Sequence, residues 1–117
     1  MLYYNNKIKK NSKYNNIKTH TFDGIYHDSK KEAKRWMELC FLQRAGEISG
    51  LRRQVPYELI PRQDGERAVK YIADFVYEVN GKEVVEDVKS PATRKNPEYV
   101  IKRKLMQYIH GIKIKEV

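Results

Sequence analysis

Two aspartates and a lysine in this chain have the types and the spacing of a divalent-metal site. Asn80-Gly81 is among the strongest sequence signals for a two-residue hairpin turn, and the ladder that it sets places Asp74 opposite Asp87. Side chains alternate between the faces of a strand, so Lys89 lies on the same face as both aspartates. Like charges directly opposite each other destabilise a sheet, whereas hard divalent cations are bound by such carboxylate oxygens. We therefore expect Asp74 and Asp87 to bind Mg²⁺ or Mn²⁺.

The other acids of this hairpin do not fit the metal site. Glu86 falls on the opposite face from Asp87. Glu78 and Glu83 pair with each other near the turn, where water screens their charges. A second explanation stays open for the whole pattern, because two surface aspartates with Lys89 as their salt-bridge partner would show the same spacing.

A helix earlier in the chain could add a fourth group to the site. Asp28-Ser29-Lys-Lys-Glu32 is a capping-box pattern, and the helix that it begins is expected to run to about Ala45, with Gly46 as its C-cap. Each residue advances about 100° around a helix, which places Glu32 inside the apolar arc near Trp36. Glu32 is therefore a candidate metal ligand, although its place in the capping box explains an acid there just as simply.

The remaining elements alternate between helices and strands. Asp23-Gly24 indicates a hairpin turn, Pro56 indicates an edge strand or a bulge, and Gly111 ends the last helix. We expect a hairpin at 21–27, a helix at 29–45, an extended segment at 51–60, a polar loop at 62–66, the acidic hairpin at 71–89, a loop at 91–96, a helix at 97–110 and a strand at 112–117. This order predicts an α/β fold with a central mixed β-sheet flanked by helices.

Apolar residues recur at helical spacing in both long helices. The expected buried stripe of the first is Ala33, Trp36, Met37, Cys40 and Phe41, widened by Leu39 and Leu42. The expected buried face of the second is Val100, Ile101, Leu105, Tyr108 and Ile109.

The composition indicates a globular protein with a polyanionic partner. The 117 residues fit one domain, expected at 20–117, preceded at 1–19 by a basic arm that either contacts nucleic acid or is a solvated terminus. The net charge of +9 favours nucleic acid, although the base composition of the genome could also supply the lysines. A single cysteine excludes a disulfide framework and a thiolate zinc cluster. Without a long apolar run or a signal-peptide core, we expect a cytoplasmic protein with no membrane contact.

Basic and polar residues near the acidic hairpin are the expected contacts with DNA. Lys102, Arg103 and Lys104 form a basic band in the last helix, and phosphate contacts of this kind make binding steeply salt-dependent. Arg94 and Lys95 in the preceding loop are further candidates, as is Gln54 on the neighbouring strand.

Several segments carry a resemblance to a known superfamily. They are Phe22-Asp-Gly-Ile, Asp28-Ser-Lys-Lys-Glu32-Ala, Gly46-Glu-Ile-Ser, Tyr71-Ile-Ala-Asp74-Phe, Val85-Glu-Asp87-Val-Lys89, Lys102-Arg-Lys-Leu and Gly111-Ile-Lys-Ile-Lys-Glu-Val. In this order the chain resembles the PD-(D/E)XK nuclease superfamily, and more closely a family of small, mostly uncharacterised phage and prophage proteins assigned to it. Ala73 stands where the motif has proline. The resemblance implies a restriction-endonuclease-like core and a nuclease whose catalytic residues are Glu32, Asp74, Asp87 and Lys89.

Three functions are compatible with the sequence. The first is a Mg²⁺-dependent DNA endonuclease, in which the Val88 carbonyl could be a further ligand and Lys89 would orient or deprotonate water or stabilise the phosphate. Similar small nucleases of this superfamily cut branched DNA as dimers, so a phage-encoded Holliday junction resolvase acting as a homodimer in its bacterial host is the specific expectation. The second is a non-catalytic, nucleic-acid-binding phage accessory protein. The third is a phage interaction protein whose charge reflects genomic bias.

Overall fold

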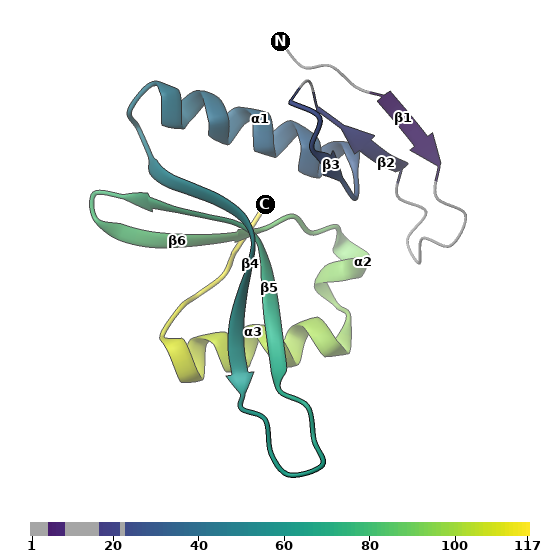
Figure 1. Ribbon diagram of the computed structural model, residues 1–117, viewed down its shortest axis with the longest axis vertical. Coiled ribbons are helices and arrows are strands. Elements are labelled where there is room, and N and C mark those ends of the chain that lie inside the picture. The colour runs from purple at the N-terminus through teal and green to yellow at the C-terminus, as the bar shows by residue number, and fades with distance from the viewer. Residues whose placement is uncertain (1–4, 9–16, 22) are drawn as a thin grey trace. The chain divides into compact units, whose positions relative to one another are not determined.

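The computed structural model of the protein (Figure 1) describes residues 5–8, 17–21 and 23–117, with side chains at 18–21 and 23–117. The chain divides into two compact units, Met1–Ile48 and Ser49–Val117. The predicted domain at 20–117 spans parts of both units, and its boundary after residue 19 stays a prediction.

The first unit contains a three-stranded antiparallel sheet and one long helix. Its strands, in the order β1-β2-β3, are β1 (Asn5–Ile8), β2 (Ile17–His20) and β3 (Tyr26–His27). The β2–β3 pair confirms the predicted hairpin, and Gly24 in its turn has a φ of 82°, which glycine adopts without strain. The predicted arm at 1–19 lies largely outside the described residues. Its described parts, 5–8 and 17–19, are in strands that the sequence pattern did not predict.

Helix α1 (Lys30–Arg44) begins and ends close to the predicted residues. Ser29 is its N-cap, and the Ser29 Oγ accepts the backbone N–H of Glu32 at 3.1 Å. The C-cap is Ala45, and Gly46 follows it with a φ of 81°. A glycine just after the cap can take this left-handed conformation and so ends the helix.

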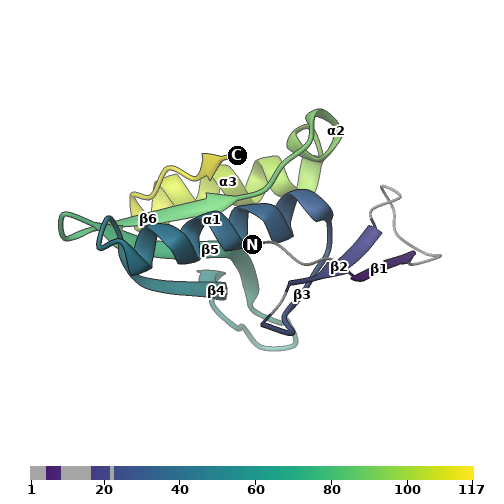
Figure 2. The ribbon, with the colours of Figure 1, turned by 90° about the horizontal axis from the view of Figure 1, so that it is seen from above.

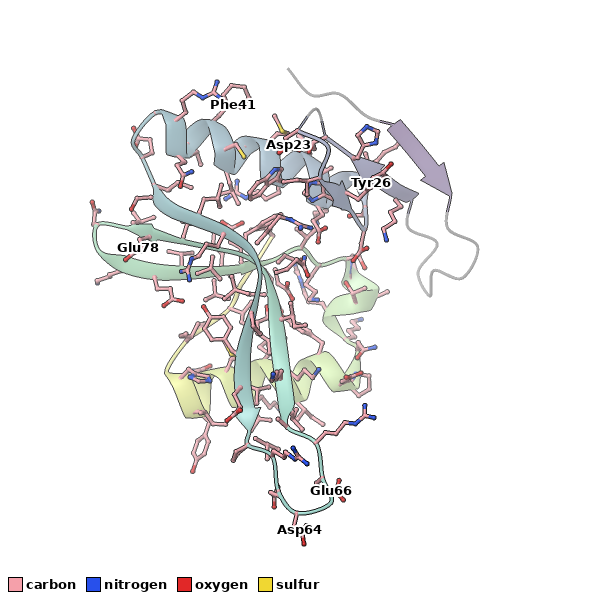
Figure 3. All side chains as sticks on the ribbon, in the orientation of Figure 1. Asp23, Tyr26, Phe41, Asp64, Glu66 and Glu78 are labelled. Atoms are coloured by element: carbon pink, nitrogen blue, oxygen red, sulfur yellow. The ribbon has the colours of Figure 1, made fainter. Side chains whose placement is uncertain are left out.

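The buried side of α1 is narrower than the predicted stripe. Ala33, Trp36, Met37 and Leu39 are buried as predicted, and Cys40 is half-buried. Phe41, however, is 52% exposed (Figure 3), so its predicted burial was wrong. Phe41 lies about 140° around the helix from Trp36, outside the arc that its buried neighbours span.

The second unit is built on a four-stranded mixed sheet. Its elements are β4 (Ser49–Ile60), β5 (Val69–Val79), β6 (Lys82–Asp87), α2 (Pro91–Arg94), α3 (Pro97–His110) and β7 (Lys115–Glu116). The strand order is β4-β5-β6-β7, with antiparallel pairs except for β7, which runs parallel to β6. The α2–α3 segment connects these two parallel strands. The predicted α/β fold class with a mixed sheet is confirmed.

The β5–β6 hairpin has the predicted register. Val79 pairs with Lys82, and the ladder continues to the pair of Phe75 with Glu86. Strand β4 lies at the edge of the sheet, as Pro56 predicted, because Pro cannot donate to a neighbouring strand. The polar loop between β4 and β5 carries Asp64 and Glu66 near its tip (Figure 3).

Helix α3 lies against the sheet of the second unit (Figure 2), and the side chains that it buries differ in part from the predicted ones. The core consists of Leu59, Tyr71, Ala73, Val76, Val85, Tyr99, Met106 and Ile114. The α3 residues in it are Tyr99 and Met106, whereas Ile101, Tyr108 and Ile109 are 58%, 87% and 44% exposed. Met106 lies about 140° around the helix from Ile101. The predicted face was therefore wrong at Ile101, Tyr108 and Ile109, whereas Leu105 packs against the core as predicted. A tyrosine ring and a thioether fill most of the space that the aliphatic side chains were expected to fill.

The predicted loop at 91–96 contains the short helix α2. Ser90 Oγ accepts the N–H of Thr93 at 3.2 Å, and Thr93 Oγ1 accepts the N–H of Ser90 at 2.7 Å. This capping box, with Pro91 at the first helical position, stabilises one turn of helix. None of the helices in the described residues is long and apolar enough to cross a membrane.

Candidate functional site

The two predicted aspartates meet across the β5–β6 hairpin. The backbone N–H of Asp74 donates to Oδ1 of Asp87 at 3.2 Å, and the N–H of Val88 donates to Oδ2 of Asp74 at 2.9 Å. Asp87 is buried, at 3% exposure, and Asp74 is half-buried. Each carboxylate is thus held by the main chain of the opposite strand, which fixes both acids on one rigid element.

Lys89 lies beside the aspartates, as predicted. Its Nζ is 2.9 Å from Oδ2 of Asp87 and 4.1 Å from the centroid of the Tyr99 ring. Lys89 thus places a positive charge directly beside the two carboxylates. Paired carboxylate oxygens of this kind are also ligands that hard divalent cations prefer.

The Tyr71 hydroxyl is a further polar group at this place, and the sequence pattern did not identify it. Burial first, and then the neighbouring carboxylates of Asp87 and Asp74, raise the pKa of Tyr71, so the hydroxyl stays protonated at neutral pH. A hydrogen bond to the Asp87 carboxylate is a further cause of the raised pKa. This contact falls outside regular hydrogen-bond geometry in the described part of the chain, so the hydroxyl lies beside the aspartates without a well-aligned partner.

The three excluded acids have other contacts. The Tyr77 hydroxyl donates to Glu86, and Nζ of Lys115 lies 3.9 Å from the same carboxylate. The Tyr57 hydroxyl donates to Glu83, which pairs with Glu78 at the exposed end of the ladder. The exclusion of these three acids from the metal site stays a prediction.

Glu32 belongs to the first unit, where it completes the N-terminus of α1. Its Oε2 accepts the backbone N–H of Asp28 at 3.1 Å and lies 3.6 Å from Nδ1 of His27. The Ser29 half of the predicted capping box is confirmed, and the Glu32 carboxylate binds the N–H of the residue before the cap. Its role as a metal ligand stays a prediction.

The predicted DNA-binding residues have different surroundings. Nζ of Lys102 pairs with Glu98 at 3.2 Å, whereas Lys104 and Lys95 are exposed. Arg94 and Arg103 converge instead on Glu116, at 3.4 and 3.3 Å. The predicted basic band therefore presents Lys104 to solvent, while Arg103 points toward the C-terminal strand.

Tyr99 and Glu116 are site residues that the sequence pattern missed. The Tyr99 hydroxyl donates to Oε2 of Glu116 at 2.6 Å, and the Tyr99 ring contacts Lys89. A signal for Glu116 was present in the sequence, because it stands two residues after Ile114. Alternation on a strand places both on one face, and Ile114 is buried.

Gln54 has an unusual backbone conformation opposite Asp74. Its φ is 53°, and its position lies between the pairs of Arg53 with Phe75 and Val55 with Ala73. A residue other than glycine in this left-handed region is strained. This strained residue therefore lies at the register position opposite Asp74.

Replacing Gln54 with glycine should leave the free energy of unfolding within about 1 kcal/mol of wild type. Relief of backbone strain stabilises the folded variant, and this offsets the larger conformational entropy that glycine loses on folding. The matched change Val55→Gly, at a regular position of the same strand, should lower it by at least about 1 kcal/mol. Urea unfolding of both variants measures the difference. Equal losses would show that Gln54 is not strained in solution.

The donor set fits Mg²⁺ or Mn²⁺. Among the described residues, no three His, Cys, Asp or Glu side chains form a group that could hold a metal ion. Mg²⁺ is commonly bound by one or two carboxylates and keeps several waters. Asp74 and Asp87, together with waters, would therefore be enough for such an ion without a third acid.

Comparison with known proteins gives a family but no activity. A protein-family model described as "Protein of unknown function (DUF1064)" matches residues 11–115. No curated protein and no solved structure matches the chain.

Proposed function

Because the chain belongs to the DUF1064 family, which has no assigned function, we propose from its site that it is a metal-dependent endonuclease that hydrolyses phosphodiester bonds in DNA. The observation that carries the proposal is the Asp74–Asp87 pair, held by reciprocal backbone hydrogen bonds with Lys89 2.9 Å from Asp87. The resemblance to the PD-(D/E)XK nucleases supports the same assignment.

In this mechanism, Asp74 and Asp87 would hold Mg²⁺ or Mn²⁺, and the Val88 carbonyl could be a further oxygen ligand. A bound ion of this kind lowers the pKa of a water and neutralises charge on the scissile phosphate. Lys89 contacts Asp87 and the Tyr99 ring through its ammonium group. We therefore assign Lys89 to electrostatic stabilisation of the phosphate and orientation of the attacking water.

The proposed substrate is DNA in the cytoplasm of a bacterium that carries the phage or prophage. The net charge of +9 supports a polyanionic substrate. Branched DNA, cut by a homodimer as a Holliday junction resolvase does, is the specific form of the proposal. The proposal of a homodimer is supported by the apolar surface that Ile101, Tyr108 and Ile109 expose along one side of α3.

The metal site can be tested without measuring cleavage. Mn²⁺ should raise the melting temperature of the wild-type protein, because an ion at 100 times its Kd adds about 2.7 kcal/mol to the stability of the state that binds it. Asp74→Asn should abolish the rise. Glu78→Gln, which removes an exposed acid from the same strand, should keep it. A rise that persists in Asp74→Asn would exclude Asp74 as a ligand.

One observation favours a second candidate function, a nucleic-acid-binding protein without catalysis. Lys89 and two backbone N–H groups already stabilise the carboxylates without a metal. This alternative predicts salt-sensitive DNA binding together with an unchanged melting temperature in Mn²⁺.

A further inference from the structure

The C-terminal strand places a carboxylate between two arginines. Oε1 of Glu116 lies 3.4 Å from Nε of Arg94, and Oε2 lies 3.3 Å from Nη1 of Arg103. Arg94 ends α2, Arg103 lies in the middle of α3, and Glu116 lies on β7. Three elements that are separate in the sequence therefore meet at one charged group.

Glu116 is ionised and fixed in this cluster. Burial alone would raise the pKa of Glu116, but the hydrogen bonds from Tyr99 and Arg103 outweigh it and hold the pKa below its ordinary value. Burial, and then the hydrogen bond to Glu116, raise the pKa of Tyr99, so its hydroxyl remains a donor. A fixed carboxylate restricts the rotamers of both arginines and so lowers the entropy that they lose when they bind an anion.

The arginines nevertheless remain open to a ligand. Their side chains are 48% and 36% exposed, whereas that of Glu116 is 19% exposed. Two guanidinium groups and one carboxylate leave one positive charge in excess. A guanidinium has five N–H donors and binds phosphate oxygens in a bidentate fork, so Arg94 and Arg103 can contact Glu116 and an anion together.

The cluster is joined to the Asp87–Lys89 segment through the main chain. The N–H of Lys89 donates to the Val117 carbonyl at 2.9 Å, and the N–H of Val117 donates to the Asp87 carbonyl at 3.0 Å. Glu116 is the register partner of Asp87 in the β6–β7 pair. The Tyr99 ring also lies against a cationic side chain from each of the two places, 4.1 Å from Nζ of Lys89 and 5.7 Å from Cζ of Arg103.

We propose that Arg94 and Arg103, positioned by Glu116, form a binding site for one backbone phosphate of the DNA strand, next to the scissile phosphate, which the metal ion at the Asp74–Asp87 pair would bind. The inference rests on the proposed function, because it names how that function's substrate is held. Tyr99 and Glu116 are positioning residues, and the two arginines contact the phosphate.

The first test compares two double variants that remove the same charge. DNA binding is measured by fluorescence anisotropy in EDTA, where no cleavage occurs, at several salt concentrations. Arg94→Ala with Arg103→Ala should raise Kd at least about tenfold and reduce the salt slope by about one, the value for one lost phosphate contact. Lys82→Ala with Lys113→Ala removes two exposed lysines and should have a clearly smaller effect. Equal changes in Kd for the two double variants would show that the arginines act only as general surface charge, and would overturn the proposal.

The second test uses Glu116→Gln. A positioning role and a net-charge effect predict opposite changes in the DNA affinity of this variant. Removal of a negative charge strengthens DNA binding if only the protein's net charge matters. If Glu116 positions the arginines, its loss weakens binding several-fold despite the added positive charge. Tyr99→Phe removes the hydroxyl that bonds Glu116 but keeps the ring beneath Lys89, and should shift Kd in the same direction by less. Tighter binding by Glu116→Gln would overturn the proposal.

Two further measurements separate the possible outcomes. The first adds inorganic phosphate and asks whether the site binds free phosphate instead of DNA. If phosphate raises the melting temperature of the wild type but not of the double arginine variant, while that variant binds DNA as tightly as the lysine control, the site takes free phosphate and the proposal fails. The binding constants are measured without metal, so they do not depend on catalysis. If Mn²⁺ has no effect on melting while both binding tests succeed, the endonuclease assignment fails and the phosphate site stands.

Discussion

Replacing Asp87 with asparagine should lower the rate of Mg²⁺-dependent DNA cleavage by on the order of 10³-fold, because a metal contributes several kcal/mol of transition-state stabilisation. Asparagine keeps the shape of the side chain and an oxygen that can still accept the N–H of Asp74. It loses the charge that binds the ion. Single-turnover cleavage of a labelled DNA, with thermal melting as a check of folding, measures the effect.

The adjacent acid provides the control for this experiment. Glu86→Gln changes a buried acid one residue away, on the other face of the strand, and glutamine can still accept the hydrogen bond from Tyr77. Its cleavage rate should stay within a few-fold of wild type. Wild-type cleavage by a folded Asp87→Asn variant would exclude Asp87 from the catalytic site.

Replacing Lys89 with methionine should lower cleavage by on the order of 10²-fold or more, because an electrostatic group aimed at the developing phosphate charge is lost. The same variant should keep, or enlarge, the rise in melting temperature on adding Mn²⁺. Nζ of Lys89 lies 2.9 Å from Oδ2 of Asp87, so its removal frees that oxygen for the metal. Cleavage assays and melting curves of one preparation measure both effects.

The pair of outcomes distinguishes Lys89 from the aspartates. Aspartate variants should lose the metal effect and the cleavage together, whereas Lys89→Met should lose only the cleavage. Lys89→Arg should restore part of the rate, because it keeps a positive charge at the site. A Lys89→Met variant that cleaves at the wild-type rate would remove Lys89 from the mechanism, and one that no longer responds to Mn²⁺ would show that it supports metal binding instead.

The hairpin could be predicted from the sequence because local rules decide its geometry. A two-residue Asn80-Gly81 turn fixes the register, and alternation then determines which side chains share a face. The structure has that register, and Asp74 and Asp87 meet as predicted. Helix α1 was predictable for the same reason, since Ser29 and Gly46 mark its ends through local hydrogen bonding and backbone freedom.

The packing of α3 could not be predicted from apolar residues alone. The helix exposes Ile101, Tyr108 and Ile109 on one side, and it packs against the core with Tyr99, Met106 and Leu105. A count of aliphatic side chains favours the wrong face, because tyrosine and methionine also bury large apolar surfaces. The same error hid Tyr99 as a site residue.

Contacts between distant segments were also beyond sequence reasoning. Strand β7 is two residues long, and its parallel pairing with β6 brings Glu116 to the arginines of α2 and α3. The periodicity of residues 112–117 indicated a strand but not its neighbour. Gln54 is similar, because its left-handed conformation has no signal in a strand of ordinary composition.

The central claim is that the Asp74–Asp87 pair makes this protein a metal-dependent DNA endonuclease, and a cleavage panel tests it most directly. Linear duplex, single-stranded, flapped and four-way-junction DNAs are incubated with the full-length protein in Mg²⁺, in Mn²⁺ and in EDTA. We expect cleavage in both metals and none in EDTA, with the four-way junction cut fastest. Folded protein that cuts none of these DNAs in either metal would contradict the claim.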